Sequence, residues 1–450
     1  MVPFERRETG QRDFFKARLD QILDLKHPLV KLAGAVNWGF LEKAFGPVYK
    51  DGPGNPPLPT RLMAGLAILK ATYNLSDEAL CERWIENPYD QMFCGEEFFR
   101  HDLPFDRSSM TRWRQRMGED KITSLVQESL NVAVDTKAAK PADFTKIIVD
   151  TTVQPKAVMF PTDAKLMNRA REKLVRLAQQ QGVKLRQSYS RVGKHALIAH
   201  QRYAHAKQFR RASRELRILR SRLGRVRRDI MRAIKGDAAK EAVFAQLLSL
   251  SHAVLFQRQR QRGKKIYSLH APEVECIGKG KAHKPYEFGV KVSVATTLER
   301  SAGGQFVAHV KALPGNPYDG HTLDKLVPVI EHQIGGTIRR IVADKGYRGH
   351  NAPDNYRARV YLSGQKRGVT AAIKRDLRRR SAVEPVIGHL KDDHGIDRNH
   401  LKGTTGDAIN AILAAAGYNF RRLIVWLRLL LCLLWQMAMP QTRPAAAQAA

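Results

Sequence analysis

A long basic stretch with helical periodicity separates the first strand-like segment of this chain from all the others. Lys146–Val153 is a short apolar run of the kind found in central strands, and Tyr286–Val294 alternates between apolar and polar residues. Between them, from about 162 to 262, leucine, isoleucine and valine recur at helical spacing. The sequence therefore predicts a sheet into which a helical segment is inserted.

The residues after the inserted segment complete this sheet. Gln305–Val310 follows a Gly-Gly turn and should pair with the alternating segment as a hairpin. A helix is predicted over 319–334, ended by Gly335-Gly336, and further strands are predicted at 338–344 and 359–362. Three antiparallel-type strands, a crossover helix and more strands predict an α/β fold with a mixed sheet flanked by helices.

Length and composition fit a globular protein of more than one domain. The 450 residues allow two or three domains of roughly 150 residues each. With 43% apolar and 27% charged residues, wholesale disorder is excluded. The four cysteines lie far apart and form no CxxC pair, so neither a disulfide framework nor a thiolate zinc site is indicated. Met1–Lys16 has no apolar signal core, and we expect a reducing, cytoplasmic environment.

One apolar run near the C-terminus needs a separate interpretation. Leu423–Met439 contains Arg428 and is shorter than the ~20 residues that a bilayer crossing needs. We interpret it as a helix that is buried or faces a partner, rather than as a membrane span. Pro440–Ala450 is expected to be a frayed tail.

The net charge indicates a polyanionic partner. The chain has 77 Lys+Arg against 43 Asp+Glu, a formal charge of +34. Lys165–Lys235 alone holds 22 basic and 3 acidic residues, which is more than half of the excess. Because a merely solvated helix face usually balances its charges, we interpret this segment, including Arg225, Arg227 and Arg228, as a surface that binds phosphates. A membrane surface is the competing partner.

The region before the first strand has the pattern of a compact helical module. After a Pro/Gly hinge at 51–59, one helix is predicted to begin at Thr60 as its N-cap and a second at Ser76. A short basic helix, Ser108–Met117, is closed by Gly118 and carries Arg112, Arg114 and Arg116. This arrangement is typical of a helix-turn-helix module, so these arginines are candidate DNA contacts; a solvated basic helix is the alternative.

Three carboxylates are candidates for a hard-cation site. Asp150 ends the apolar part of IIVDTT, Asp344 follows a strand in IVADKGYRG, and Glu384 lies in RRRSAVEPVIGHLK. Open sheets place functional groups at strand ends, and carboxylate oxygens are ligands that Mg²⁺ prefers. Two such ions, ~3.5–4 Å apart, can promote in-line displacement at phosphorus.

Each of these carboxylates also has a purely structural interpretation. An aspartate after a strand is often a turn residue or a helix N-cap, and Ser381–Glu384 fits an S-x-x-E capping box. Glu384 and Lys391 share one helix face, since seven steps of ~100° nearly complete two turns. Arg380 joins that face only if the helix starts before Ser381.

Several short sequence motifs, taken in their order along the chain, match a known family. The string Arg380-x3-Glu384-x6-Lys391 resembles the R-x3-E-x6-K signature of bacterial insertion-sequence transposases. From about residue 10 to 425 the chain resembles the IS-five-type DDE transposases more closely, and Thr60–Gly118 is similar to their helical N-terminal domain. The motifs that support this resemblance are VDTTVQ at 149–154, PTDAKL at 161–166, KGKAHKPYEFG at 279–289, NPYDGHTL at 316–323 and ADKGYRG at 343–349. The broader signature has a tyrosine three positions before the arginine, where this chain has Leu377.

The resemblance implies a ribonuclease-H-like catalytic fold with Asp150, Asp344 and Glu384 as catalytic residues and ligands of two Mg²⁺ ions, for which Mn²⁺ can substitute. It implies that Arg380 and Lys391 bind DNA phosphates, with Lys345 and Arg348 as further contacts. The predicted domains are a helical DNA-binding domain at 1–140, the catalytic domain at 141–162 and 263–400, the basic helical insertion at 163–262, and C-terminal helices and tail at 401–450.

The function expected from these observations is DNA transposition. The enzyme would bind the ends of its insertion sequence, cleave them and join the 3′-OH ends to target DNA, as a homodimer on double-stranded DNA in the bacterial cytoplasm, associated with the nucleoid. A catalytically inactive DNA-binding protein or a repressor at the element ends is the alternative. A nuclease acting on RNA or hybrids with the same fold is a second alternative.

Overall fold

The computed structural model describes residues 17–49, 56–258, 261, 263–278, 285–357 and 359–438, with the side chains of 431–438 left out. The predictions for the N-terminal 16 residues, for 51–55 of the hinge, for KGKAHK at 279–284 and for the tail at 440–450 lie outside these residues. The chain forms two compact units. The first comprises Met1–Gln154, Lys291–Leu401 and Thr405–Ala450, and the second comprises Pro155–Val290 and Lys402–Thr404.

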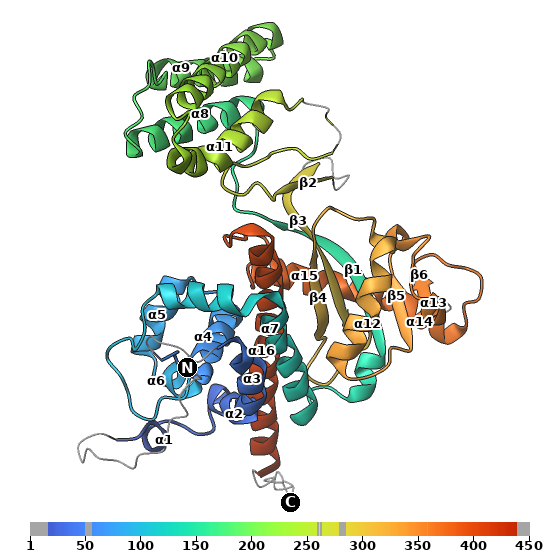
Figure 1. Cartoon of the computed structure of the whole chain (residues 1–450). Helices are drawn as coiled ribbons and strands as arrows, with labels where there is room; N and C mark the ends of the chain where they lie inside the picture. Colours follow the sequence, from blue (N-terminus) through green and yellow to red (C-terminus); the bar gives the residue numbers. More distant parts are fainter. Residues whose placement is uncertain are drawn as a thin grey trace, which may run out of the picture. The chain divides into compact units, whose positions relative to one another are not determined.

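The first unit begins with a layer of helices, coloured blue to cyan in Figure 1. These elements are α1 (Leu19–Ile22), α2 (Pro28–Ala35), α3 (Trp38–Phe45), η1 (Gly46–Val48), α4 (Thr60–Tyr73), α5 (Asp77–Glu86), α6 (Pro88–Phe93), α7 (Ser108–Asp135) and η2 (Pro141–Thr145). Helix α5 begins as predicted, because the Ser76 hydroxyl accepts a hydrogen bond from the Ala79 N–H at 3.0 Å. Thr60 is not an N-cap: it is the first residue of α4, and Pro59 precedes it without a side-chain cap.

The predicted end of the basic helix at Gly118 is confirmed as a break inside α7. Gly118 has φ +65° and ψ −171°, a conformation that glycine adopts far more readily than other residues. The helix resumes directly after it and runs to Asp135. The predicted short helix is therefore the first segment of a longer broken one.

A six-stranded mixed sheet follows in the described residues. Its strands are β1 (Lys146–Pro155), β2 (Glu275–Gly278), β3 (Tyr286–Thr297), β4 (Val307–Leu313), β5 (Arg340–Ala343) and β6 (Val360–Leu362). The order is β2-β3-β1-β5-β6, with β4 pairing with β3 beyond the end of β2. Strand β1 is parallel to β5, and β5 is parallel to β6. Strands β1 and β3 run antiparallel, since Leu298 N donates to Lys146 O and Lys156 N donates to Phe288 O.

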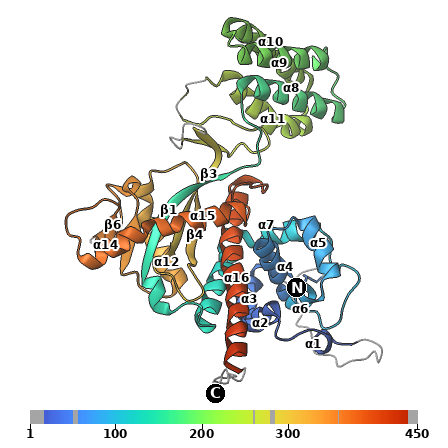
Figure 2. The same cartoon turned by 180° about the vertical axis from the view of Figure 1, so that it is seen from behind.

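Helices cover both faces of this sheet, as the sequence predicts (Figures 1 and 2). The remaining elements of the first unit are η3 (Asp319–Thr322), α12 (Leu323–Ile334), η4 (Lys345–Tyr347), α13 (Asp354–Arg357), α14 (Ala371–Arg378), η5 (Arg379–Ala382), α15 (Val383–Asp392) and α16 (Gly403–Ala438). Ile147 and Val149 of β1 pack in one core with residues of α12. Ile148 points to the other face, where it packs with Val383 of α15, as the two-residue period of a strand requires.

The long helix α16 joins the N-terminal helices to the sheet. The side chain of Asn419 is fully buried; its Nδ2 donates to Ser129 Oγ of α7 at 2.9 Å, and its Oδ1 accepts from Val307 N of β4 at 2.9 Å. Trp426 Nε1 donates to Thr136 O at 3.0 Å, just after α7. Among the helices that the structure describes, none is long and apolar enough to cross a bilayer.

The second unit contains the predicted helical insertion. Its helices are α8 (Asp163–Gln180), α9 (Ser190–His205), α10 (Phe209–Ala233) and α11 (Ala238–Phe256), which share one apolar core. In α10, Leu219, Leu223 and Ile230 are buried in that core while most of the arginines face outward. Strand β2 and the first residues of β3 belong to the same unit, so it extends beyond the insertion predicted at 163–262. The predicted four-part domain division stays a prediction.

Candidate active site

Asp150 and Asp344 lie at the same level of two adjacent strands. Strands β1 and β5 are paired in parallel with Val149 opposite Ala343, so Asp150 and Asp344 occupy the next position on each chain. Strand β5 ends at Ala343, and the chain then turns into η4, while β1 continues to Pro155. Because residues directly opposite in paired strands point to the same face, the two carboxylates share the α15 face of the sheet.

Glu384 reaches this place from α15. Its neighbour Val383 packs against Ile148 and Val342, which lie two positions before the two aspartates. This contact fixes the start of α15 beside the strand ends. The predicted capping box at Ser381 is wrong: Ala382 is the N-cap and makes no side-chain cap, because the chain enters α15 through the 3₁₀ turn η5.

Arg380 contacts all three predicted catalytic carboxylates. Its Nη2 donates to Glu384 Oε1 at 2.7 Å, one turn further along. Its Nη1 lies 3.4 Å from Asp150 Oδ2 and 3.6 Å from Asp344 Oδ1. Because η5 is continuous with α15, Arg380 does lie on the face of Glu384. A single guanidinium thus stands among three carboxylates that come from three separate segments.

Asp150 is the most enclosed of the three carboxylates. Its side chain is 19% exposed, against 47% for Asp344 and 59% for Glu384. Burial raises the pKa of Asp150 to about 6, helped by the negative charges of Asp344 and Asp319 and opposed by the Thr151 N–H and by Arg380. Thr151 N donates to Oδ1 at 2.8 Å, which leaves Oδ2 facing Arg380. A cation at this position would favour the ionised carboxylate.

The donor set fits a hard divalent cation. Three carboxylates already surround one positive charge, and Mg²⁺ prefers such oxygen ligands. Within the described part of the chain, no three His, Cys, Asp or Glu side chains are arranged to hold an ion as they stand. In the candidate site, the guanidinium of Arg380 takes the place among the carboxylates that an ion would need.

A fourth carboxylate near the site is absent from the residues singled out in the sequence. Asp319 Oδ1 accepts from Lys291 Nζ at 3.0 Å, and the same ammonium donates to Pro317 O at 2.8 Å. Burial raises the pKa of Tyr347 well above its usual value, and the charges of Asp319, Asp150 and Asp344 raise it further. Asp319 lies inside the motif NPYDGHTL, and this motif is the sequence feature that could have identified Asp319 as a site residue.

The other residues of this region that are predicted to bind phosphate lie close to Asp344 and Glu384 along the chain. Lys345 and Arg348 are exposed at and just after η4, directly following Asp344. Lys391 is half-buried near the C-terminal end of α15, on the helix that carries Glu384. Leu377, at the position of the signature tyrosine, packs against the core cluster of Ile148, Val342 and Val383.

One of the three arginines predicted to contact DNA in α7 is not on the surface. Arg114 is 4% exposed, and its two terminal nitrogens bind the carboxylate of Asp77 at 2.9 and 2.5 Å. It is therefore a buried ion-pair partner of α5, and its prediction as a DNA contact is corrected. Arg112 and Arg116 are exposed. In the insertion, Arg225 and Arg228 are exposed on α10 and Arg227 is half-buried.

Comparison with known proteins finds two family matches, one in the N-terminal helices and one that covers most of the sheet. Residues 17–116 match a family described as "Transposase domain (DUF772)", and residues 256–420, which include Asp344 and Glu384, match a family described as "Transposase DDE domain". The chain is 47% identical over 204 residues to "Uncharacterized protein ORF8 in nfe locus" of Rhizobium meliloti. These aligned residues make up 45% of this chain and 98% of that protein. No solved structure matches the chain. The chain belongs to the transposases with a DDE domain.

Proposed function

We propose that this transposase is of the IS-five type and is catalytically active. It binds the ends of its insertion sequence, cleaves them and joins the 3′-OH ends to target DNA, with Asp150, Asp344 and Glu384 as catalytic residues. The observation that carries this proposal is the contact of Arg380 with all three carboxylates, although Asp150 lies 230 positions away in the chain. A protein that only binds DNA has no use for this convergence.

The three carboxylates would hold the Mg²⁺ ions of the reaction, with Mn²⁺ as a substitute. When bound, such ions activate an attacking oxygen and stabilise a leaving one at phosphorus. The chain's own part is to hold the ligands in place. Thr151 N fixes one oxygen of Asp150, and the packing of Val383 fixes the start of the helix that carries Glu384. Arg380 must withdraw from the carboxylates, and we propose that it then binds a DNA phosphate together with Lys391, Lys345 and Arg348.

The fold supports a ribonuclease-H-like catalytic domain. Its mixed sheet has helices on both faces, and of its first two carboxylates Asp150 lies in β1 and Asp344 directly follows the adjacent parallel strand β5. The exposed Arg112 and Arg116 of α7 and the exposed Arg225 and Arg228 of α10 supply positive charge for the DNA duplex. Because two element ends must be held together for joint strand transfer, we propose that the protein acts as a dimer on DNA.

An excision assay tests this proposal. A plasmid carries the gene with its flanking terminal sequences, and loss of the element is measured for the wild type and for Asp150→Asn, Asp344→Asn and Glu384→Gln. We expect each substitution to abolish excision, while binding of the terminal sequences in EDTA changes little. Asp392→Asn, an exposed carboxylate on the same helix as Glu384, is the matched control and should excise normally.

The alternative function gives a different result in the same assay. An inactive DNA-binding protein or repressor would bind the terminal sequences but would not excise the element even as wild type. Excision by any of the three carboxylate variants would overturn the assignment of that residue.

A further inference from the structure

Two segments of the first unit, one before α12 and one after it in the chain, are bonded to each other beside the candidate active site. The first, residues 317–322, leads from β4 through η3 into α12, and we call it the η3 segment. The second, residues 344–351, follows β5 through η4, and we call it the η4 segment. The η4 segment begins with Asp344 and carries Lys345 and Arg348, so whatever fixes it also fixes the surroundings of the carboxylates.

Hydrogen bonds join the two segments through their main chains. The Tyr318 hydroxyl donates to Arg348 O at 2.7 Å. Asn351 N donates to Gly320 O at 2.9 Å, and Asn351 Nδ2 donates to His321 O at 3.1 Å. Because each acceptor is a backbone carbonyl, these bonds fix the course of the chain and not only the rotamers of side chains.

Asn351 also ties the η4 segment to helix α12. The N-cap residue of α12, Thr322, makes no side-chain cap. Instead, Asn351 Oδ1 accepts from Asp324 N at 3.3 Å, which is one of the first-turn N–H groups that a helix leaves without an internal partner. Helix α12 packs in one core with β1 and β5, so the η4 segment is anchored to the body of the sheet.

The two segments lie too close together for a side chain at Gly320. A Cβ built there would lie 3.1 Å from Tyr347 O and 3.3 Å from His350 Cα, which is tighter than an ordinary contact. Nearer to Asp344, a Cβ built on Gly346 would lie 3.4 Å from Asp319 Oδ2. The η4 segment thus rests on the η3 segment from residue 346 to residue 351.

The main chain of Arg348 is held on both sides. Its N–H donates to Lys345 O at 3.1 Å, and its carbonyl accepts from the Tyr318 hydroxyl. The Tyr318 ring packs edge-to-face against His321, with ring centroids 5.1 Å apart, which keeps the hydroxyl in place. Arg348 itself is exposed, so its guanidinium extends from a fixed main chain. An anchored arginine loses less conformational entropy on binding a phosphate than an arginine on a mobile loop does.

We propose that Tyr318 is a positioning residue of this transposase: its hydroxyl fixes the main chain of Arg348 so that the guanidinium meets a DNA phosphate next to the carboxylates. The inference rests on the proposed function, in which Arg348 binds such a phosphate. Tyrosine has one O–H, and Tyr318 donates it to Arg348 O, so Tyr318 acts on the DNA through Arg348. Asn351 supports the same segment from its other end.

A double-mutant cycle on the full chain tests this inference. Binding to a duplex of the element's terminal sequence is measured in EDTA for the wild type, Tyr318→Phe, Arg348→Gln and the double variant. Tyr318→Phe removes only the hydroxyl, and we expect it to weaken binding about fivefold, the usual effect of one hydrogen bond. In the Arg348→Gln background the same change should have no effect, because no guanidinium is left to position. A tyrosine that served the fold alone would weaken binding equally in both backgrounds.

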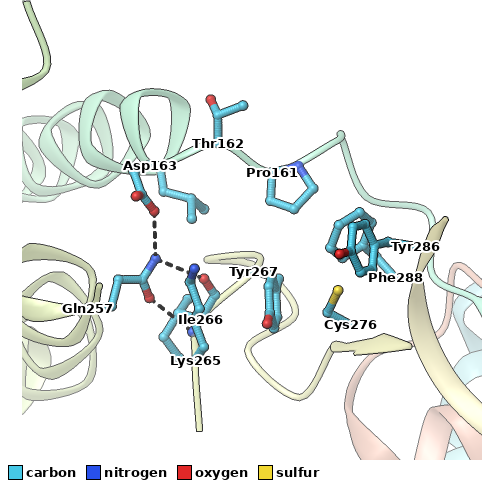
Figure 3. Close-up of a pocket in the computed structure, with 11 residues that line it drawn as sticks. Pro161, Thr162, Asp163, Gln257, Lys265, Ile266, Tyr267, Cys276, Tyr286 and Phe288 are labelled. Carbon is cyan, nitrogen blue, oxygen red and sulfur yellow. Dashed lines mark hydrogen bonds between the residues drawn. The ribbon is translucent and has the colours of Figure 1, made fainter. Parts of the chain in front are cut away.

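The matched control is Tyr267→Phe, which removes a tyrosine hydroxyl in the second unit, where Tyr267 lines a pocket with Cys276 (Figure 3). This variant should bind the duplex like the wild type. Hydrogen exchange gives a readout that involves no DNA. Exchange in the peptide that contains Tyr347 and Arg348 should be faster in Tyr318→Phe than in the wild type, and unchanged in Tyr267→Phe.

The possible results separate this inference from the proposed function. Wild-type affinity of Tyr318→Phe, equal weakening in both backgrounds, or unchanged hydrogen exchange would overturn the inference and leave the proposed function standing. An Arg348→Gln variant that binds as tightly as the wild type would contradict the proposed phosphate contact of Arg348, and the positioning role of Tyr318 would be overturned with it.

Discussion

The Nη1 atom of Arg380 lies 3.4 Å from Oδ2 of Asp150, across 230 positions of sequence. The same guanidinium contacts Asp344 and Glu384, so one positive charge faces the three carboxylates of the candidate site. Arg380 and a divalent cation therefore compete for the same oxygens. We propose that this competition links metal binding to DNA binding, because a DNA phosphate that attracts Arg380 would free the carboxylates.

Removing the charge of Arg380 should strengthen metal binding in the absence of DNA. We expect Arg380→Gln to bind Mn²⁺ roughly tenfold more tightly than the wild type, since a cation next to the ligands no longer repels the ion. Electron paramagnetic resonance of free Mn²⁺ measures this affinity without any activity. Arg378→Gln, an exposed arginine two residues earlier, is the control for a change in net charge. Equal Mn²⁺ affinities of Arg380→Gln and the wild type would show that Arg380 does not compete.

Arg112 and Arg114 should differ sharply in their effects on stability. Arg114→Ala removes the bidentate partner of Asp77, which keeps its ion pair with Lys70 Nζ at 2.9 Å, so we expect a loss of about 1–3 kcal/mol in the free energy of unfolding. Arg112→Ala changes an exposed side chain and should stay within about 0.5 kcal/mol of the wild type. Urea denaturation of the three proteins measures both values. Similar stabilities of the two variants would contradict the buried position of Arg114.

Glu128 should make stability depend on pH. This carboxyl is 1% exposed in α7, and burial raises its pKa to about 7 from an ordinary value of 4.5. The unfolded chain releases this proton at lower pH than the folded chain does, so the group lowers stability as pH rises from about 4.5 to 7. Above that range the loss is complete, at about 3 kcal/mol.

The variant Glu128→Gln should remove this dependence. We expect it to be more stable than the wild type at pH 8 and to match it more closely at pH 5, because Gln carries no charge and its oxygen can still accept from Asn37 N. Thermal unfolding at the two pH values gives the comparison, with Asp120→Asn, exposed on the same helix, as the control. If the wild type unfolds at a higher temperature than the variant at pH 8, the raised pKa of Glu128 is contradicted.

Charge reversal on α10 should weaken DNA binding in a salt-dependent way. We expect Arg225→Glu with Arg228→Glu to lower the affinity for duplex DNA and to flatten the plot of log affinity against log salt by about 2, since each lost phosphate contact removes ~0.9 from the slope. Fluorescence anisotropy over a range of salt concentrations measures this. An unchanged slope would make the insertion a scaffold or a dimer contact instead.

Strands and strand ends were predictable because their patterns are local. The apolar run of β1, the alternation of β3 and the glycine after α12 each predict the element that the structure contains. Strand β2 was missed, because Glu275–Gly278 is too short and too polar to show a two-residue period. The capping box at Ser381 was wrong because α14 and η5 lead directly into α15, and the sequence pattern does not reveal that approach.

The burial of Arg114 could have been predicted from its helical spacing. Its positive charge led instead to the prediction of a DNA contact. Met110, Trp113 and Met117 are all buried, and Arg114 is four residues after the first and three before the last, on the same helix face. The contact of Arg380 with Asp150 is different in kind. The sequence motifs identify the three carboxylates. The distances between them depend on the pairing of β1 with β5 and on the packing of Val383, which the motifs do not give.

Metal-directed cleavage of the protein itself tests most directly whether Asp150, Asp344 and Glu384 form one ion site. Fe²⁺ replaces Mg²⁺ in the full chain and reduces added hydrogen peroxide to hydroxyl radicals, while ascorbate returns Fe³⁺ to Fe²⁺. The radicals cut the backbone next to the bound ion, and the fragments are sized by mass spectrometry. We expect cuts near all three residues in the same protein, all of them suppressed by excess Mg²⁺ and all lost together in Asp150→Asn. Cuts near only one of the three, or cuts that persist in Asp150→Asn, would contradict a shared site.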